Sequence, residues 1–301
     1  MVLGIWLLGA AMARAEPGAL LGNIDFTTDS DGFHATRIRA GALSPYESYL
    51  DHAGVAVQHT WYSQAQWRRE VTGVVGLWRK QDRTTLAGVN AEAGVVEVAG
   101  HTRLIGDVTW SVRPAPATGV ELIAAADLVD TRPALDRGIA YGLLAMSAEQ
   151  RLLERLTVIG FVGYQPFTDG NERIHGRARI VFDALPEYGV NLQLRWRGYE
   201  SRQTDVGGAY FNPQRYRQWT GAVGFRNRHA GWMWQGTLGA GRETIDNVNT
   251  QPVALAELRA EGPFNEKLRI AFTAIYNKSV GYVDAPDYSY RRLGVTLIYR
   301  F

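Results

Sequence analysis

The 301-residue chain contains no cysteine. This absence excludes a disulfide framework and any cysteine-ligated metal centre, and it suits a protein that crosses an oxidising compartment. Beyond its first fifteen residues the chain has no apolar run approaching the ~18 residues of a membrane helix, so no helical span is expected. Its charges nearly cancel, with 32 basic and 30 acidic side chains, which gives no reason to expect a nucleic-acid partner.

Motifs for catalysis, cofactors or metals are also missing. The six histidines show no metal-ligand spacing, so we predict no metal site. The glycine-rich segment 236–241 is not followed by a helical pattern, and we interpret it as a strand rather than a phosphate loop. We therefore predict no catalytic residues, no cofactor and no enzymatic activity.

Alternation of apolar and polar side chains is the main feature of this sequence. In the last segment, 289–301, Leu293, Val295 and Leu297 share one face and Thr296 lies on the other. A period of two is that of a β-strand, and the pattern recurs upstream. The strand-like segments are 20–28, 33–42, 53–63, 66–79, 84–97, 102–113, 119–130, 137–149, 155–165, 172–183, 189–200, 215–228, 232–244, 252–262, 267–278 and 289–301. We predict an all-β fold, a transmembrane antiparallel up-and-down β-barrel of about sixteen strands, with fourteen as the alternative.

The first fifteen residues resemble a secretory signal, because Val2 to Met12 is apolar and small residues follow at 13–15. We predict a signal peptide at 1–15 and an outer-membrane β-barrel over 16–301. The alternative is that Met1 is an arbitrary start within a longer chain.

The lengths of the connections predict the orientation of the barrel. If both termini are periplasmic, the long connections 201–214 and 279–288 face outside, as is usual for such barrels. The long segment 43–52 fits less well, since it falls on the periplasmic side. Residues 143–156 could also form a helix, but we prefer two strands joined by a turn.

The polar face of the strands predicts the lining of the lumen. An arginine facing lipid at mid-membrane would cost about 2–4 kcal/mol, so charged side chains in the strands should point inward. They would form a network of paired charges there, or a conduit for a hydrated polymer. The candidates are Glu92, Asp107, Glu121, Asp127, Arg177, Arg179, Asp183, Arg195, Arg197, Glu257, Arg259 and Glu261.

The last segment carries aromatic residues that resemble an assembly signal. Tyr299 and the terminal Phe301 lie on the apolar face of the last segment. A closing strand that ends in an aromatic residue resembles the assembly signal of bacterial outer-membrane barrels. We therefore expect outer-membrane lipid and the barrel-assembly machinery as partners.

A local motif in the longest connection points to a family. Tyr210, Phe211, Asn212 and Pro213 stand within the segment Gly208-Ala209-Tyr210-Phe211-Asn212-Pro213-Gln214-Arg215-Tyr216, ahead of Trp219, the Trp232–Gln235 run and the glycines at 239 and 241. This order resembles the barrel domain of PgaA-like poly-N-acetylglucosamine exporters and related exopolysaccharide-export proteins of the outer membrane. The resemblance covers about the last hundred residues.

The resemblance implies a pore that secretes a polysaccharide similar to poly-N-acetylglucosamine. Exporters of this class carry a periplasmic tetratricopeptide-repeat region before the barrel, and no 34-residue helical repeat is present in this sequence. We expect a barrel-only relative, a half that works with a separate periplasmic tetratricopeptide-repeat protein, or a truncated chain. The alternative functions are a small-solute porin, a barrel enzyme acting on lipid or lipopolysaccharide, or a structural barrel without an open lumen.

Overall fold

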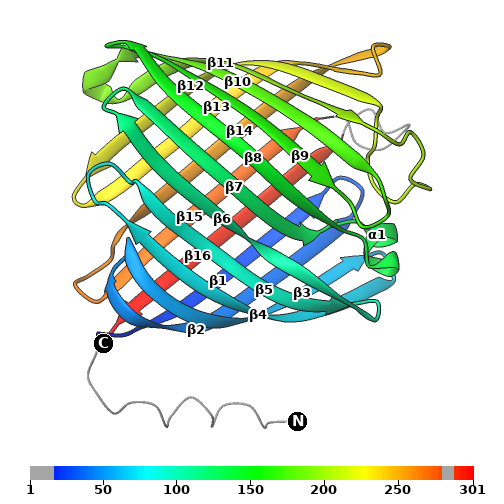
Figure 1. Cartoon of the computed structure of the whole chain (residues 1–301), viewed down its shortest axis with the longest axis horizontal. Helices are drawn as coiled ribbons and strands as arrows, with labels where there is room; N and C mark the ends of the chain where they lie inside the picture. The colour runs from blue at the N-terminus through cyan, green and yellow to red at the C-terminus, as the bar shows by residue number, and fades with distance from the viewer. Residues whose placement is uncertain (1–16, 280–287) are drawn as a thin grey trace.

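The computed structural model describes residues 17–279 and 288–301, which form a closed antiparallel β-barrel (Figure 1). Each strand pairs with its neighbours in sequence, and β1 closes the ring against β16, from Ala19 opposite Arg300 to Asp29 opposite Tyr290. The signal peptide expected at 1–15 lies outside the described residues.

Sixteen strands lie within the described part of the chain, which confirms the predicted number and excludes fourteen. Residues 143–156 belong to two strands and a turn, as predicted, and not to a helix. The strands are β1 Ala19–Asp29, β2 Phe33–Ser48, β3 Asp51–Gln64, β4 Trp67–Gln81, β5 Gly88–Val98, β6 His101–Ala115, β7 Thr118–Leu128, β8 Ala140–Leu153, β9 Leu156–Pro166, β10 Glu172–Leu185, β11 Val190–Ser201, β12 Arg215–His229, β13 Trp232–Ile245, β14 Asn249–Pro263, β15 Leu268–Lys278 and β16 Ser289–Arg300.

Two elements differ from the sequence prediction. The prediction of a long connection over 43–52 is wrong, because β2 continues to Ser48 and only residues 49–50 join it to β3. The β2–β3 register shifts between Leu43 and Ser48, and such a bulge interrupts the period-two pattern that the prediction used. A short helix, α1 (Arg132–Arg137), with Thr131 as its N-cap, lies between β7 and β8 and was also not expected.

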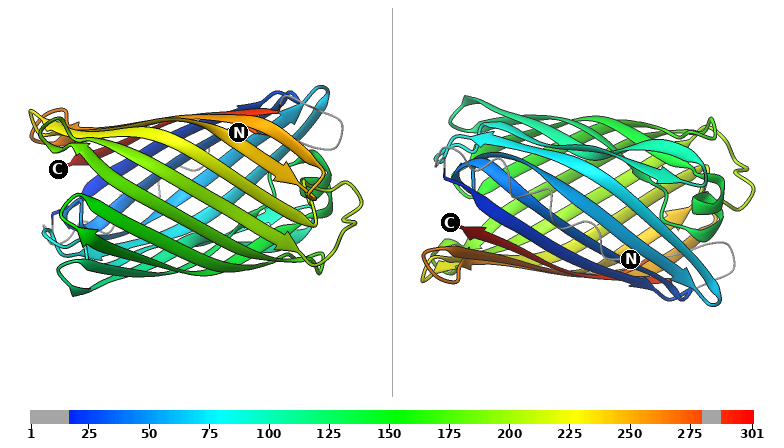
Figure 2. Two further views of the ribbon diagram at one scale, coloured as in Figure 1. Left: turned by 90° about the horizontal axis from the view of Figure 1, so that it is seen from above. Right: turned by 90° about the horizontal axis from the view of Figure 1, so that it is seen from below.

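The two ends of the barrel differ in their connections. The last residue, Phe301, lies at one end, whereas α1 and the β11–β12 connection lie at the other (Figures 1 and 2). The longest described connections, 129–139 and 202–214, are both at the α1 end. Outer-membrane barrels have short periplasmic turns and longer outside loops, so the α1 end is the outer mouth. Among the described residues, no helix is long and apolar enough to cross a membrane.

The outer face of the barrel is an apolar belt. Leu104 is 70% exposed and Leu238 is 68% exposed, although both side chains are entirely hydrocarbon. Further large apolar side chains on this face are Leu20, Val55, Val74, Leu144, Val162, Leu192, Leu194, Val223, Phe272 and Leu293. A continuous apolar surface of this extent is unfavourable in water and suits the hydrocarbon of a bilayer.

The inner face is polar only in part, which the alternation pattern did not predict. On the side of β2–β6, inward residues such as Tyr62, Val71, Val75 and Ile105 are buried and pack into one hydrophobic cluster. The neighbouring position Val74 points outward, so β4 is apolar on both faces. Packed side chains therefore fill this side of the interior, and the water-accessible cavities lie beside the cluster.

Candidate functional site: the lumen and its outer mouth

The structure places the predicted charged residues on the inner face of the barrel. Three of them, Glu92, Asp107 and Asp127, line a cavity of about 440 Å³ that is bounded by β1–β8 and β16. Five more line a second cavity of about 400 Å³ against β10 and β11: Arg177, Arg179, Arg195, Arg197 and Glu257. Glu121, Asp183, Arg259 and Glu261 lie an even number of residues from these on their own strands, and therefore share the inner face.

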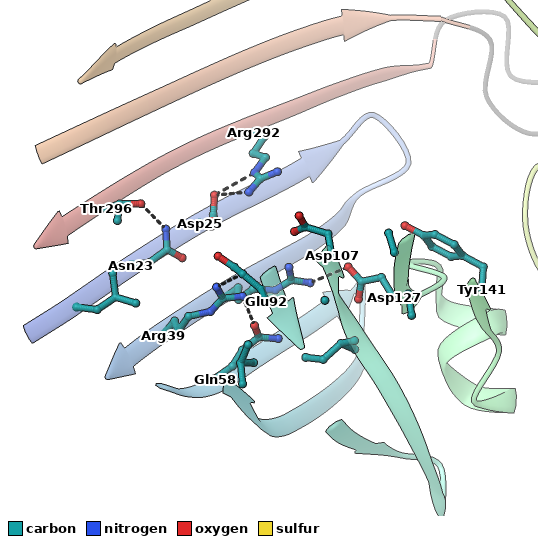
Figure 3. Close-up of a pocket in the computed structure, with 17 residues that line it drawn as sticks. Asn23, Asp25, Arg39, Gln58, Glu92, Asp107, Asp127, Tyr141, Arg292 and Thr296 are labelled. Carbon is teal, nitrogen blue, oxygen red and sulfur yellow. Dashed lines mark hydrogen bonds and ion pairs between the residues drawn. The ribbon is translucent and has the colours of Figure 1, made fainter. Parts of the chain in front are cut away.

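Paired charged side chains line the first cavity (Figure 3). Arg39 Nη1 lies 2.6 Å from Glu92 Oε2, and Arg39 Nη2 also donates to Gln58 at 2.9 Å. Across the β1–β16 seam, Arg292 Nε donates to Asp25 Oδ1 at 2.9 Å. These pairs connect strands that are distant in sequence, so they brace the barrel and neutralise most of the charge on this wall.

Asp107 is the exception on the first wall. It stands opposite Glu92 in the β5–β6 register, so two carboxylates face each other across the strands. The preceding Gly106 has a φ of 128°, and a Cβ there would lie 2.0 Å from the carbonyl oxygen of Glu92. Only glycine allows this approach of the two backbones, and it fixes where the Asp107 side chain enters the lumen.

Sequence reasoning missed several residues of the first cavity. Asp25, Arg37, Arg39 and Arg292 all line it and were not among the predicted lumen residues. The signal was available, because each of them lies on the polar side of an alternating segment. Their partners were not predictable, since each partner comes from another strand.

Four arginines gather on the opposite side of the ring. In the β10–β11 register, Arg177 stands opposite Arg197 and Arg179 stands opposite Arg195. Strands β10 and β11 are eight positions round the sixteen-strand ring from β2 and β3. We call these four residues the arginine quartet.

The longest described loop, 202–214, folds against the outer mouth. Arg137 of α1 donates to the carbonyl oxygens of Val206 and Gly207, at 3.3 Å and 3.0 Å. Thr131 donates to the carbonyl oxygen of Ala209 at 2.5 Å. The short helix that the sequence did not reveal therefore positions this loop, and its C-terminal Gly138, in the left-handed region at φ 62°, turns the chain back into β8.

Asn171, which is fully buried, fixes the Tyr-Phe-Asn-Pro motif in place. Its Nδ2 donates to Tyr210 Oη at 3.1 Å and to Asn212 Oδ1 at 2.9 Å. Asn212 in turn donates to the carbonyl oxygen of Gln203 at 2.7 Å, which ties the two ends of the loop together. Pro213 is buried beside them. The motif therefore stabilises the conformation of the loop through these hydrogen bonds, and Tyr210 and Pro213 are both buried.

Aromatic rings line the mouth next to this loop. Arg173 lies over the rings of Phe167, Tyr199 and Tyr210, at 4.9, 4.8 and 5.2 Å from their centroids. A cavity of about 340 Å³ below them is lined by His175, Arg177, Arg197, Gly198, Tyr199, Phe211, Tyr216, Asn277, Ser279, Tyr288 and Tyr290. This mouth cavity shares Arg177 and Arg197 with the quartet cavity, so aromatic and basic linings follow each other along β10 and β11.

The C-terminal residues lie on the outer face. Tyr299 is 43% exposed and Phe301 is 50% exposed, both on the lipid side of β16. The backbone N–H of Phe301 donates to the carbonyl oxygen of Gly18 at 3.1 Å, which joins the two ends of the barrel sheet. Among the described residues, no group of three or more His, Asp or Glu side chains is placed to hold a metal ion.

No protein-family model matches the chain, and no curated protein matches it. Solved structures do match. One described as a bacterial polysaccharide outer membrane secretin superimposes with a TM-score of 0.69 at 12% sequence identity, covering 96% of this chain and 100% of that one. OpdQ of Pseudomonas aeruginosa gives a TM-score of 0.48 at 9% identity, covering 96% of this chain and 100% of its own. OprD of Pseudomonas aeruginosa gives 0.45 at 11% identity, with coverages of 95% and 94%.

At these identities the first likeness establishes the fold and nothing finer. The closed sixteen-strand barrel has no free sheet edge, its outside is an apolar belt, and its inside holds charged side chains. In this arrangement the backbone N–H and C=O groups of the strands are hydrogen-bonded to neighbouring strands within the hydrocarbon, and the charged side chains are kept away from lipid. The chain is therefore a β-barrel of the bacterial outer membrane.

Proposed function

We propose that the barrel is a pore for the secretion of an exopolysaccharide. The observation that carries the proposal is the aromatic cavity at the outer mouth, which shares Arg177 and Arg197 with the polar cavity along β10 and β11. Tyrosine and phenylalanine rings can pack against the C–H faces of sugar rings, while hydroxyl, amide and guanidinium groups bond to sugar hydroxyls. A lumen built only to brace the barrel needs paired charges but has no need of clustered rings at its exit.

Two likenesses support the choice of a polysaccharide. The loop motif at 208–216 resembles that of PgaA-like exporters, which implies a polymer similar to poly-N-acetylglucosamine. A solved barrel that superimposes on 96% of this chain is itself described as a bacterial polysaccharide outer membrane secretin. The resemblance to the exporters leads us to propose a separate periplasmic tetratricopeptide-repeat partner. The closing strand with Tyr299 and Phe301 leads us to propose assembly through the barrel-assembly machinery.

A small-solute porin is the second candidate. The loop 202–214 is fastened to the neighbouring connections of the outer mouth, and its Phe211 lines the mouth cavity. The individual cavities have volumes of about 340 to 440 Å³, which would hold a mono- or disaccharide. If the protein is a porin, the loop 202–214 constricts the pore permanently. If it is a secretion pore, the exported polysaccharide displaces this loop.

Two measurements test the proposal. In the native host, deletion of the gene should abolish polymer in the medium while the synthase still makes it, and re-expression of the barrel should restore export. Purified barrel in planar bilayers should conduct ions, and conductance should rise when 203–210 is replaced by a two-residue turn. Normal polymer export without the protein would refute secretion. A conducting pore in that case would identify a porin.

A further inference from the structure

The arginine quartet has fewer acidic partners than its charge requires. Glu257 Oε2 lies 3.6 Å from Arg195 Nη1, and within the part of the chain that the structure describes no other carboxylate lies within 4.0 Å of the four guanidinium groups. On one flank Glu149 is held by Arg113 at 2.9 Å. On the other flank Glu243 meets Arg197 only through the hydroxyl of Tyr216, which accepts from Arg197 and donates to Glu243 at 2.5 Å. One carboxylate is therefore in ion-pair contact with four guanidinium groups, and the wall carries an excess of positive charge.

Neutral groups hold the guanidinium groups in place. Arg197 donates to Tyr216 Oη at 2.9 Å, and Arg195 donates to Gln193 Oε1 at 2.8 Å. Arg177 lies 4.6 Å from the centroid of the Phe161 ring. These contacts orient the side chains but leave their charge unbalanced, and Arg197 Nε is buried without a partner.

Placing like charges directly opposite each other in a β-sheet is unfavourable. Here it occurs twice in succession, at Arg177–Arg197 and at Arg179–Arg195. A bracing network has no need for this arrangement. In the first cavity Glu92 also faces a like charge, Asp107, but there Arg39 pairs with Glu92, and Arg292 pairs with Asp25. An anion between the arginines would remove the repulsion, because guanidinium groups bind planar carboxylates through two parallel hydrogen bonds.

We infer that the arginine quartet is a binding subsite for the carboxylate groups of an acidic saccharide in transit through the lumen. The inference rests on the proposed secretion of an exopolysaccharide, but it departs from the polymer that the loop motif implies, because poly-N-acetylglucosamine carries no carboxylate. It assigns to the pore a polymer whose sugar units carry uronate-type carboxylates. It also disfavours the passage of a polycation, such as a deacetylated glucosamine chain, along this side of the lumen.

The position of the quartet fits this role. Arg177 and Arg197 border both the aromatic mouth cavity and the quartet cavity, so a saccharide chain on this path meets rings and guanidinium groups in turn. Across the ring, the carboxylates of Asp25, Glu92 and Asp127 have an arginine partner within 4.0 Å, whereas Asp107, opposite Glu92, has none among the described residues. The excess positive charge is therefore on the wall of β10 and β11, and an anionic chain would be drawn along these two strands.

The test uses the reconstituted full chain in planar bilayers, with trigalacturonate, tri-N-acetylglucosamine and triglucosamine as anionic, neutral and cationic probes. We expect an anion-selective reversal potential in a KCl gradient, and current block strongest for trigalacturonate and weakest for triglucosamine. The double variant R179Q/R195Q should weaken block by trigalacturonate about tenfold or more, because it removes two charge-assisted contacts. The control is R269Q. Arg269 lies on β15, outside the quartet, and pairs with the inner-face residue Glu261 at 3.8 Å, so its loss should change the block by less than about twofold.

Each outcome bears on one claim. A conducting barrel that selects cations, or that triglucosamine blocks most strongly, would overturn the inference and leave the pore standing. A folded barrel that does not conduct would instead refute the proposed function. In that case calorimetric titration of trigalacturonate into the barrel in detergent would decide the subsite, with binding lost in R179Q/R195Q supporting it and no binding by the wild-type chain overturning it.

Discussion

The ring of Tyr210 stacks on the ring of Phe167, with centroids 4.8 Å apart and planes 9° from parallel. The two residues belong to different outer loops, and their contact closes the small hydrophobic cluster that holds loop 202–214 against the mouth. The side chain of Tyr210 is buried, and its hydroxyl donates to Asp169 at 2.9 Å. Burial first, and then this hydrogen bond to a carboxylate, raise the pKa of Tyr210 to about 12. The phenol therefore stays protonated and remains a donor throughout the physiological range.

Replacement of Tyr210 by alanine should release the loop and raise single-channel conductance. The change removes the stacked pair, a contribution of about 0.5–1.5 kcal/mol beyond simple burial, together with the hydrogen bond to Asp169. The control is Tyr188→Ala, which removes an exposed tyrosine from a periplasmic turn. Equal conductance in the wild type and in the Tyr210 variant would show that the loop does not restrict the pore.

Replacement of Asn171 by alanine should make the loop sensitive to protease. The buried amide links Tyr210, Asn212 and the backbone of Gln203, and each polar group left unpaired costs about 1–3 kcal/mol. Trypsin should then cut after Arg202 in folded protein, which gel electrophoresis without heating would reveal. Asn265→Ala, in a periplasmic turn, should leave the cleavage pattern unchanged, and an intact loop in the Asn171 variant would contradict this account.

The alternation of lipid-facing and lumen-facing side chains can be tested by single cysteines, because the chain has none of its own. Cysteine at Arg195 should react with a water-soluble thiol reagent, whereas cysteine at Leu192 or Leu194 should be protected by lipid. The measurement is mass spectrometry of labelled protein in native membranes. Reaction at the leucine positions with protection at Arg195 would reverse the assignment of the two faces.

Deletion of Phe301 should reduce the amount of folded, heat-modifiable barrel in the membrane. Its N–H closes the sheet against Gly18, and its ring lies at the seam where β1 and β16 meet. Replacement of the exposed Phe264 by alanine in a periplasmic turn is the control for loss of a phenylalanine. Unchanged assembly without Phe301 would mean that the terminal aromatic residue is incidental.

Acid should weaken the attachment of α1 to β4. Partial burial opposes ionisation of Asp136, but hydrogen bonds from Arg69 (2.5 Å) and Trp67 (3.0 Å) outweigh it and lower the pKa of Asp136. A lowered pKa stabilises the fold above the unfolded-state pKa of ~3.9, and this contribution is lost as the pH falls through the folded value. Urea titrations should therefore show a smaller effect of Asp136→Asn at pH 3 than at pH 7, and an equal effect at both would refute the ion pair.

The sequence by itself determined the strands and their two faces. A side chain in a β-strand alternates strictly between faces, and lipid rejects charge, so the rows at 190–196 and 268–274 could point only one way. Alternation also placed Arg177, Arg179, Arg195 and Arg197 on one side of two neighbouring strands. These are local rules, and the structure follows them for the faces of the strands. The strand ends differ more, since β2 extends to Ser48 where 42 was predicted and β5 begins at Gly88 where 84 was predicted.

Only the tertiary structure decided which side chains meet. The facing of Arg177 and Arg197 depends on a cross-strand register that is set by the turn between β10 and β11. The pairing of Asp25 with Arg292 depends on closure of the ring between the first strand and the last. The packing of α1, Asn171 and Tyr210 around the outer loop joins three connections that no local pattern relates. Such contacts arise only when closing the barrel brings distant segments together, because their free energy comes from burial and partners that the isolated segments lack.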